Sequence, residues 1–167
     1  MTERELFIGT PEDNFRLIYS RSEETAQILE FLEESSIVFF YSAAGNGKTA
    51  FGVEFRERVP NVALILGSQI GTDDYKANKG IYDNSYGEAS IIIADEFGSP
   101  CRSGRETIDG LLSEGKKFIF MTHFPKSRYI KWREQHQEFD PLIMGLIRDY
   151  PNAPWLHLSK WKDKSKF

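Results

Sequence analysis

The residues of this chain that are best suited to chemistry are Lys48 and Thr49, which end a short glycine-rich run. Residues 42–49 read Ser-Ala-Ala-Gly-Asn-Gly-Lys-Thr and follow the apolar residues 37–41. A strand that turns through glycines into a helix directs backbone N–H groups and a helix N-terminus at one point, which suits a phosphate group. In such a phosphate-binding loop the lysine reaches the β- and γ-phosphates of a nucleotide, and the threonine hydroxyl ligates Mg²⁺. We therefore predict that ATP and Mg²⁺ are bound by Ala43, Ala44, Gly45, Asn46, Gly47, Lys48 and Thr49.

Two carboxylates lie at the end of a second apolar run. Residues 90–94 are Ser-Ile-Ile-Ile-Ala, and Asp95 and Glu96 follow them. Because side chains alternate between the faces of a strand, the two acids are expected to have different roles. Asp95 is predicted to hold Mg²⁺, directly or through water, and Glu96 to polarise the water that attacks the γ-phosphate. The alternatives are solvated acids at a strand end and a chance glycine-rich turn, in which Ser42 stands where glycine is usual; the pairing of the two motifs argues against both.

A third apolar run, residues 118–121, ends in Thr122 and His123. Some P-loop ATPases place an extra strand between the phosphate-loop strand and the acidic strand, and a polar residue at the end of that strand senses the γ-phosphate. Thr122 is the predicted sensor, and His123 is the other candidate. The alternative interpretation is an ordinary strand-end hydroxyl followed by a loop histidine.

Cationic residues supply two further candidate sites. Residues 126–133 interleave four cations with two aromatic residues, which suits single-stranded nucleic acid but equally describes a solvated amphipathic helix. Arg102, Arg105 and Arg148 are candidates for an arginine finger supplied to a neighbouring subunit. Of these we predict Arg148 to be the catalytic one.

The spacing of apolar residues predicts the elements that position these groups. Strands are expected at residues 37–41, 62–66, 90–94, 118–121 and 155–158. Helices are expected at residues 23–34, 49–58, 105–114, 127–137 and 142–148, and residues 67–88 are expected to be irregular. Unbroken apolar strands are typical of a parallel sheet that is buried on both faces. The expected fold class is α/β: a three-layer P-loop NTPase fold with a mostly parallel five-stranded sheet, of the additional-strand, catalytic-glutamate type.

Length and composition limit the possible function classes. The 167 residues suit one domain, divided into an N-terminal arm and helix (1–36), an ATPase domain (37–159) and a basic tail (160–167). A net charge of −4 argues against coating nucleic acid by bulk electrostatics, so any such contact needs a local patch. The single cysteine, Cys101, excludes an internal disulfide and a cysteine-based zinc site. We expect no signal peptide and no membrane segment, and hence a soluble intracellular protein of the cytoplasm, a host-cell nucleus or a virion.

The motifs, in this order, resemble those of superfamily 3 helicases of small viruses. The closest resemblance is to the ATPase domain of replication-initiator proteins from circular single-stranded DNA viruses. Gly45-Asn46-Gly47-Lys48-Thr49 resembles their Gly-x-Gly-Lys-Ser/Thr, and residues 81–88, leading into 91–97, resemble their aromatic-Asp-x-x-Tyr-x-Gly segment and acidic strand. Residues 120–125 are similar to their apolar-apolar-Thr-Ser-Asn motif, and residues 146–148 to their arginine-bearing segment. The likeness spans about residues 37–158.

The resemblance implies a nucleic-acid-linked ATPase of viral or mobile-element replication. It implies a homo-oligomeric ring that acts on single-stranded DNA or RNA and in which each subunit completes its neighbour's site. Three departures limit the comparison. Residues 1–36 are too short for the family's nicking domain, and His123 replaces part of its Ser-Asn pair. The interval from Asp95 to Thr122 leaves little room for its DNA-gripping β-hairpin.

Other functions are compatible with the same motifs. A genome-packaging ATPase or a helicase loader works without such a hairpin. A small nucleotide kinase has this length, but it needs an arginine-rich lid and does not normally end its central strand in Asp-Glu. A GTP switch is disfavoured, because residues 95–98 mimic its Asp-x-x-Gly but residues 78–81 lack the final Asp that guanine requires. Ser42 leaves open a binding module without catalysis.

Overall fold

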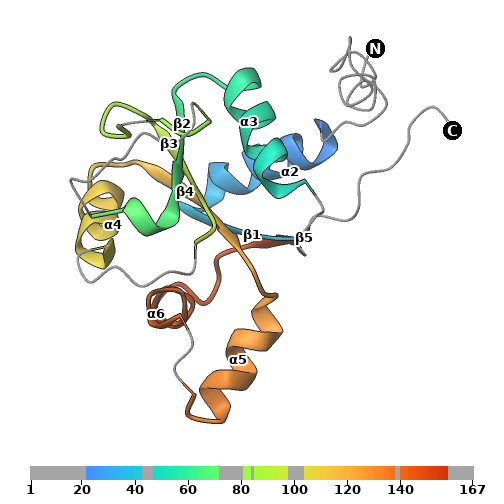
Figure 1. The fold of residues 1–167 in the computed structure, drawn as a ribbon, viewed down its shortest axis with the longest axis vertical. Coiled ribbons are helices and arrows are strands. Elements are labelled where there is room, and N and C mark those ends of the chain that lie inside the picture. The colour runs from blue at the N-terminus through green and yellow to red at the C-terminus, as the bar shows by residue number, and fades with distance from the viewer. Residues whose placement is uncertain are drawn as a thin grey trace, which may run out of the picture.

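The computed structural model describes residues 22–42, 47–71, 81–83, 85–97, 104–137 and 140–157. Strands and helices alternate along most of the chain (Figure 1). The helices are α2 (Ser22–Glu34), α3 (Lys48–Arg58), α4 (Gly104–Ser113), α5 (Lys126–Glu134) and α6 (Pro141–Asp149). The strands are β1 (Ile37–Tyr41), β2 (Val62–Leu66), β3 (Ile91–Asp95), β4 (Lys117–Thr122) and β5 (Trp155–His157), and a 3₁₀ turn, η1 (Gly67–Gln69), follows β2.

The five strands form one sheet in the order β2-β3-β4-β1-β5, and every neighbouring pair is parallel. β4 therefore lies between β1, which leads toward the glycine-rich run, and β3, which ends in Asp95. This is the predicted extra-strand arrangement, and the expected α/β fold class is confirmed. Because all strands run the same way, their carboxyl ends meet at one edge, which is where open parallel sheets bind ligands.

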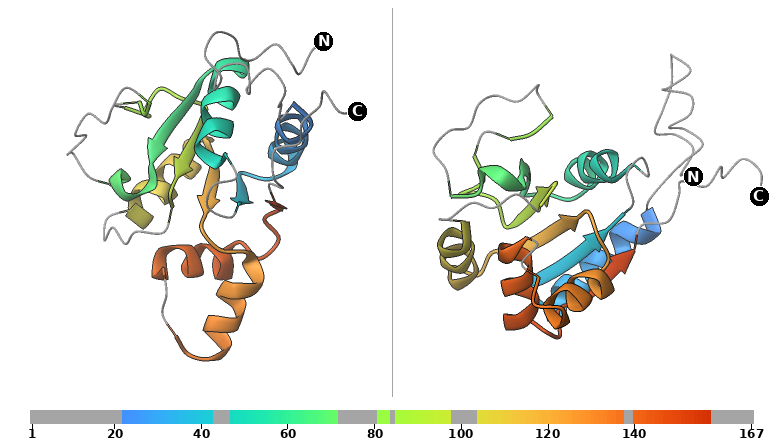
Figure 2. Two further views of the ribbon diagram at one scale, coloured as in Figure 1. Left: turned by 45° about the vertical axis from the view of Figure 1, so that its right-hand side comes forward. Right: turned by 60° about the horizontal axis from the view of Figure 1, so that its bottom comes forward.

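Helices cover both faces of the sheet, which makes three layers (Figure 2). Alternate strand residues face opposite sides, so that Val38 and Phe40 of β1 belong to one core cluster and Ile37 and Phe39 to the other. The first cluster also contains side chains of α2 and α3. The second contains side chains of α4, α5 and α6. The helical residues buried in these clusters are Ile28, Leu32, Phe51 and Phe55 on the first face, and Ile108, Leu111, Tyr129, Ile143, Leu146 and Ile147 on the second.

The observed elements follow the predicted ones closely. β1 and β2 have the predicted bounds, and β5 begins at the predicted residue, while its predicted end lies outside the described residues. The other strands and the helices shift by one to three residues at their ends. The largest difference is in α5, which ends at Glu134 rather than at residue 137. Gln135 leaves the helical conformation, and His136 has a φ of 56°. In the described part of residues 67–88, η1 is the one regular element, as the irregular composition predicted.

Several sequence predictions lie outside the described residues. They concern Ala43, Ala44, Gly45 and Asn46 of the phosphate loop, Cys101 and Arg102, and both chain termini. The division into arm, ATPase domain and tail stays a prediction; α2 itself packs on the sheet through Ile28 and Leu32. No described helix combines the length and apolarity needed to cross a membrane.

Candidate nucleotide site at the carboxyl edge of the sheet

The turn from β1 into α3 directs a helix N-terminus at the carboxyl edge. Gly47 precedes α3 with φ 82° and ψ 27°, a left-handed conformation in which glycine carries no steric cost. Its carbonyl accepts the N–H of Phe51 at 2.8 Å and so starts the helix. Lys48 and Thr49 occupy the first turn, where unpaired backbone N–H groups favour an anion. In the described residues, a helix N-terminus thus follows the glycine-rich run directly, and the phosphate-binding role of the loop stays a prediction.

Asp95 is the centre of the polar contacts at this edge. It is fully buried, yet its carboxylate accepts three hydrogen bonds. Oδ2 accepts the Thr49 hydroxyl at 2.6 Å and the Tyr82 hydroxyl at 2.8 Å, and Oδ1 accepts the N–H of Glu96 at 2.9 Å. The structure thus brings together Thr49 and Asp95, the two residues predicted to hold Mg²⁺. Burial, with the Asp95 carboxylate beside it, raises the pKa of the Tyr82 phenol, so this hydroxyl stays protonated and donates.

A short segment, residues 81–83, brings Tyr82 to the site. β2 is an edge strand, and Asp83 contacts it through its backbone N–H and its side chain. The N–H of Asp83 donates to the carbonyl of Leu64 at 2.7 Å, and the N–H of Leu64 donates to Asp83 Oδ2 at 2.8 Å. Arg56 of α3 donates to the carbonyl of Ile81 at 2.7 Å and lies 3.2 Å from Asp83 Oδ2. These contacts fix the backbone on both sides of Tyr82.

Glu96 lies just beyond the end of β3 in a left-handed conformation with φ 49°. A non-glycine residue rarely adopts this conformation, and holding it there costs about 1 kcal/mol or more. The turn returns the chain to β4, where the N–H of Phe97 donates to the carbonyl of Met121 at 2.9 Å. Asp95 is therefore buried while Glu96 is exposed. The different surroundings of the two acids therefore arise from this turn rather than from strand alternation.

Gly67 allows the turn at Glu96 to lie close to the end of β2. A Cβ at Gly67 would be 2.8 Å from the Cα of Phe97 and 3.1 Å from the carbonyl oxygen of Asp95. Both contacts are with backbone, which has little freedom to move away. Only a glycine at this position is compatible with the observed backbone of residues 95–97.

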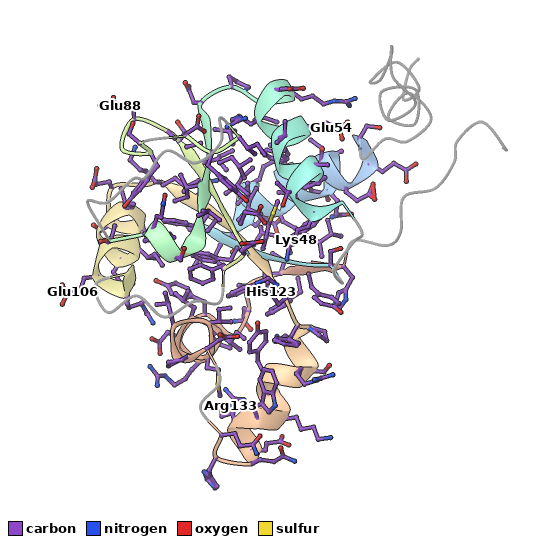
Figure 3. The ribbon with its side chains drawn as sticks, in the orientation of Figure 1. Lys48, Glu54, Glu88, Glu106, His123 and Arg133 are labelled. Carbon is purple, nitrogen blue, oxygen red and sulfur yellow. The ribbon has the colours of Figure 1, made fainter. Side chains whose placement is uncertain are left out.

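Lys48 lies in a site of mixed polarity. Burial lowers the pKa of its ammonium group, and the negative charges of Asp95 and Glu96 oppose that effect. The side chain is therefore partly desolvated and close to both carboxylates, which suits a group that is to meet an added polyanion. In Figure 3, Lys48 lies near the centre of the molecule, and Arg133 lies at the far end of α5.

Thr122 is the last residue of β4 and is fully buried, opposite Tyr41 of β1. Its hydroxyl donates to the carbonyl of Phe124 at 2.9 Å and so closes the turn into α5. His123, the other sensor candidate, is exposed. Thr122 thus lies at the carboxyl end of β4 with its hydroxyl bonded in the turn, and its role as a sensor stays a prediction.

Arg148 lies at the amino edge of the sheet, where the strands begin, opposite the carboxyl edge that holds Asp95. Its Nε is 3.0 Å from Asp149, and Asp149 lines a groove of about 520 Å³ together with Phe31 and Glu34 at the end of α2. α2 ends where β1 begins, whereas Asp95 is where β3 ends, and a five-residue strand spans about 16 Å. Arg148 and the nucleotide site of its own chain are therefore at different edges.

Arg105, another of the arginine candidates, is held at that same edge. It lies 2.9 Å from Asp109 and 2.8 Å from Asp149, and its guanidinium stacks on the Tyr150 ring. These contacts join α4 to α6, and they give Arg105 a packing role. Arg148, by contrast, is 68% exposed.

The residues present fit a magnesium ion that is shared with phosphate groups. Within the described residues no three carboxylate, histidine or cysteine side chains gather as a metal site. Thr49 and Asp95 offer a hydroxyl and a carboxylate, which are oxygen ligands of the kind that Mg²⁺ prefers. Mg²⁺ usually takes one or two protein oxygens and completes its shell with substrate phosphates and water. The fit is therefore to a nucleotide-bound ion.

Sequence reasoning missed two residues of the site, Tyr82 and Gly67. Tyr82 belongs to the segment whose likeness to an aromatic-Asp motif was noted, but the target of its hydroxyl is visible only in the fold. Gly67 follows a predicted strand directly, and a glycine at that position is a signal of close backbone approach.

Comparison with solved structures shows the fold that the topology indicates. A Pif1 helicase structure on DNA unwinding at forked duplexes matches with a TM-score of 0.53 and 16% identity, over 84% of this chain and 44% of that one. A Bacteroides Pif1 structure in complex with ADP-AlF4 matches with a TM-score of 0.52 and 16% identity, over 83% and 42%. This chain therefore spans less than half the length of these helicases.

A protein of Streptococcus pyogenes serotype M3, described as a primosome component, matches along nearly its whole length. Its TM-score is 0.52 at 17% identity, over 95% of this chain and 94% of that one. No family model and no curated protein matches the sequence. At these identities the likeness shows a shared P-loop helicase-like fold, and the narrower resemblance to superfamily 3 helicases stays a prediction.

Proposed function

We propose that this protein hydrolyses ATP with Mg²⁺ and couples hydrolysis to work on nucleic acid, as a helicase or translocase of viral or mobile-element replication does. The observation that carries the proposal is the 2.6 Å hydrogen bond between Thr49 and Asp95. It joins the start of α3 to the end of β3, at the edge where a helix N-terminus favours an anion. One hydroxyl and one buried carboxylate at that point suit a metal-bound triphosphate.

The structural neighbours support the same proposal. Bacteroides Pif1 structures contain ADP-AlF4, or ADP-AlF3 with single-stranded DNA. Those ligands belong to Pif1; for this chain they favour a nucleotide as ligand and single-stranded nucleic acid as partner. DNA and RNA are both compatible with the proposal.

Each residue of the site has a distinct role in the proposed reaction. The triphosphate lies along residues 43–49, and the ammonium group of Lys48 compensates charge on its terminal phosphates. Thr49 and Asp95 would hold Mg²⁺, which when bound neutralises charge on the phosphate oxygens. The exposed carboxylate of Glu96 orients a water molecule toward the γ-phosphate and accepts its proton. Thr122 would detect the γ-phosphate from the end of β4.

Arg148 completes the proposed site from a second subunit. Its position at the edge where strands begin leaves its own nucleotide out of reach, while its exposure leaves it accessible to a neighbouring chain. A head-to-tail ring would set this edge against the carboxyl edge of the next subunit. Arg148 would then compensate the charge that develops in the transition state, an effect worth about 10³-fold or more in rate.

A helicase loader is the second candidate. One observation favours it: the primosome component matches over nearly the full length of both chains, whereas the Pif1 helicases are more than twice as long as the part matched. Between β3 and β4 the described residues contain α4 and no hairpin. A loader would hydrolyse ATP in the presence of nucleic acid without separating strands.

Two variants test the assignment of the nucleotide site. Lys48→Ala is expected to weaken equilibrium ATP binding, whereas Glu96→Gln is expected to keep binding and lose hydrolysis in a single-turnover assay. Normal turnover by Glu96→Gln would refute the role given to Glu96. A forked-duplex unwinding assay with the wild-type protein then separates a helicase from a loader, since only a helicase releases the displaced strand.

A further inference from the structure

Helix α5 concentrates positive charge on an acidic protein. The chain carries a net charge of −4, yet α5 contains four cations and one acid, Glu134. The cations are Lys126, Arg128, Lys131 and Arg133. Three of them are exposed, and no carboxylate in the described ranges forms an ion pair with any of the four. Such a local excess of cations attracts a polyanion.

Aromatic rings alternate with these cations along one side of the helix. At 100° per residue, Arg128, Lys131 and Trp132 share that side, and Phe124 lies one turn before Arg128. The guanidinium of Arg128 is 5.5 Å from the Phe124 ring centroid and 5.7 Å from that of Trp132. Both rings are only partly buried. We call these four residues the basic-aromatic face.

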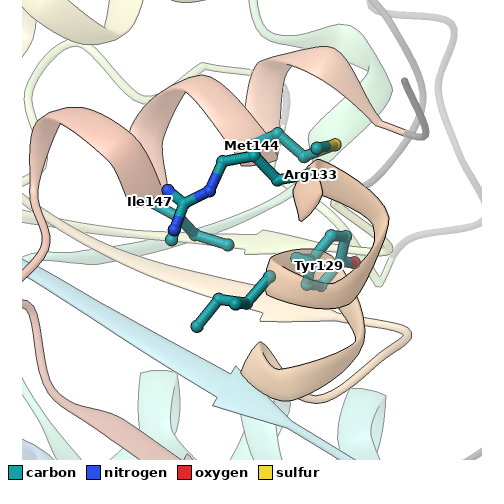
Figure 4. A pocket seen from close by; sticks show the side chains of 5 residues that line it. Tyr129, Arg133, Met144 and Ile147 are labelled. Carbon is teal, nitrogen blue, oxygen red and sulfur yellow. The ribbon is translucent and has the colours of Figure 1, made fainter. Parts of the chain in front are cut away.

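The other side of α5 packs against α6 and so fixes the direction of the basic-aromatic face. Tyr129 is buried there, and a crevice between the two helices is lined by Tyr129, Ile130, Arg133, Met144 and Ile147 (Figure 4). The crevice has no room for a water molecule, so it is an internal contact rather than a ligand site. The basic-aromatic face is therefore presented by a helix whose opposite side is anchored.

The face is directly connected to the candidate nucleotide site. α5 follows the carboxyl end of β4 after a three-residue turn and extends away from the sheet (Figures 1 and 2). The buried Thr122 hydroxyl, at the nucleotide edge, donates to the carbonyl of Phe124, and Phe124 belongs to the face. One short turn thus links the basic-aromatic face to the candidate nucleotide site.

We propose that the basic-aromatic face of α5 binds single-stranded nucleic acid. Arg128 and Lys131 contact backbone phosphates, and unpaired bases stack on Trp132 and Phe124. An unpaired strand is favoured over a duplex, because only unpaired bases offer their flat faces to the rings. The inference rests on the proposed function, and it identifies the surface that holds the nucleic acid.

Fluorescence anisotropy with the full chain tests the surface. The probes are labelled oligothymidylate and oligouridylate of about 16 nucleotides, titrated at several salt concentrations. Lys131→Gln is expected to weaken binding and to lower the slope of log K against log salt by about 0.7, the value of one lost phosphate contact. Lys116→Gln is the control, because it makes the same charge change in the turn before β4, away from α5. Thermal unfolding verifies that each variant is folded.

A second variant tests stacking. Trp132→Ala is expected to weaken binding roughly tenfold, and Trp132→Phe, which keeps an aromatic ring, is expected to restore most of the affinity. If Lys131→Gln and Trp132→Ala bind as tightly as Lys116→Gln, α5 is not the binding surface and the inference is wrong. The inference is also wrong if the wild type binds duplex and single-stranded nucleic acid with equal affinity and both variants weaken the two by the same factor. Failure of the wild type to bind either oligonucleotide would instead contradict the proposed nucleic-acid function.

Discussion

The Tyr82 hydroxyl donates a 2.8 Å hydrogen bond to Asp95 Oδ2, the oxygen that also accepts the Thr49 hydroxyl. Because Thr49 uses its hydrogen toward Asp95, the lone pairs of its oxygen remain available to a cation. The two hydroxyls occupy Oδ2, and the N–H of Glu96 occupies Oδ1. A second lone pair of Oδ1 remains available to Mg²⁺ or to a water molecule bound to it, and we infer that Tyr82 holds Asp95 in place for that purpose.

Replacing Tyr82 by Phe removes only the hydroxyl. The Mg²⁺ concentration that gives half-maximal ATP hydrolysis should rise about tenfold, as is typical when a group behind a metal ligand is lost. A magnesium titration of steady-state hydrolysis measures this. Tyr86→Phe is the matched control, since its hydroxyl accepts the N–H of Gly71 at 3.5 Å. Equal magnesium requirements in the two variants would contradict the role of Tyr82.

Gly67→Ala should destabilise the protein by about 1–3 kcal/mol, the usual cost of forcing an extra methyl group into packed structure. The new Cβ would press on the backbone of Phe97, and the turn that holds Glu96 would have to shift. Urea unfolding measures the change, and hydrolysis should fall with it. Gly110→Ala in α4 is the control. Nothing lies within 4 Å of a Cβ at this position, so the free energy of unfolding is expected to rise by up to about 1 kcal/mol. No difference between the two would show that the end of β2 tolerates a side chain.

ATP binding should weaken on the alkaline side because of Lys48. Only the charged ammonium group attracts phosphate. Because burial lowers the pKa of this group, its charge is lost at a lower pH than that of a free lysine, whose pKa is about 10.4. Affinity should therefore decline before that pH is reached. Equilibrium binding across the alkaline range measures the decline. Lys48→Arg should remove the pH dependence, since arginine stays charged; a decline that persisted in this variant would have another origin.

Arg148 can be tested by mixing two inactive variants. Arg148→Ala keeps its own Glu96, and Glu96→Gln keeps its own Arg148. If the arginine acts across a subunit boundary, a mixture should regain part of the hydrolysis that each variant lacks alone, because some interfaces combine both intact residues. No recovery in a mixture that demonstrably co-assembles would exclude this role for Arg148.

Much of the fold could be predicted because its elements are locally encoded. Residues 37–41 and 62–66 are apolar, β-branched or aromatic, and their strands have the predicted bounds. The position of β4 between β1 and β3 was also predicted, from the polar residues that end the third apolar run. The contact from Tyr82 to Asp95 could not be predicted, because it depends on how Asp83 pairs with the edge of β2. The left-handed turn at Glu96 could not be predicted either, because glutamate does not favour this conformation and the room that Gly67 leaves for the turn is visible only in the fold.

The position of Arg148 also depends on the whole fold. Its sequence context suggested a role in catalysis but could not tell at which edge of the sheet it lies. That position depends on where the end of α6, the last helix before β5, lies against the end of α2.

The most direct test of the central claim is steady-state ATP hydrolysis by the full chain, with and without single-stranded DNA and RNA, beside Glu96→Gln. The account predicts hydrolysis that rises with polynucleotide and is lost in Glu96→Gln. Absence of hydrolysis, or hydrolysis that Glu96→Gln retains, would contradict the proposed site. Hydrolysis that depends on Glu96 but ignores both polynucleotides would contradict the coupling to nucleic acid.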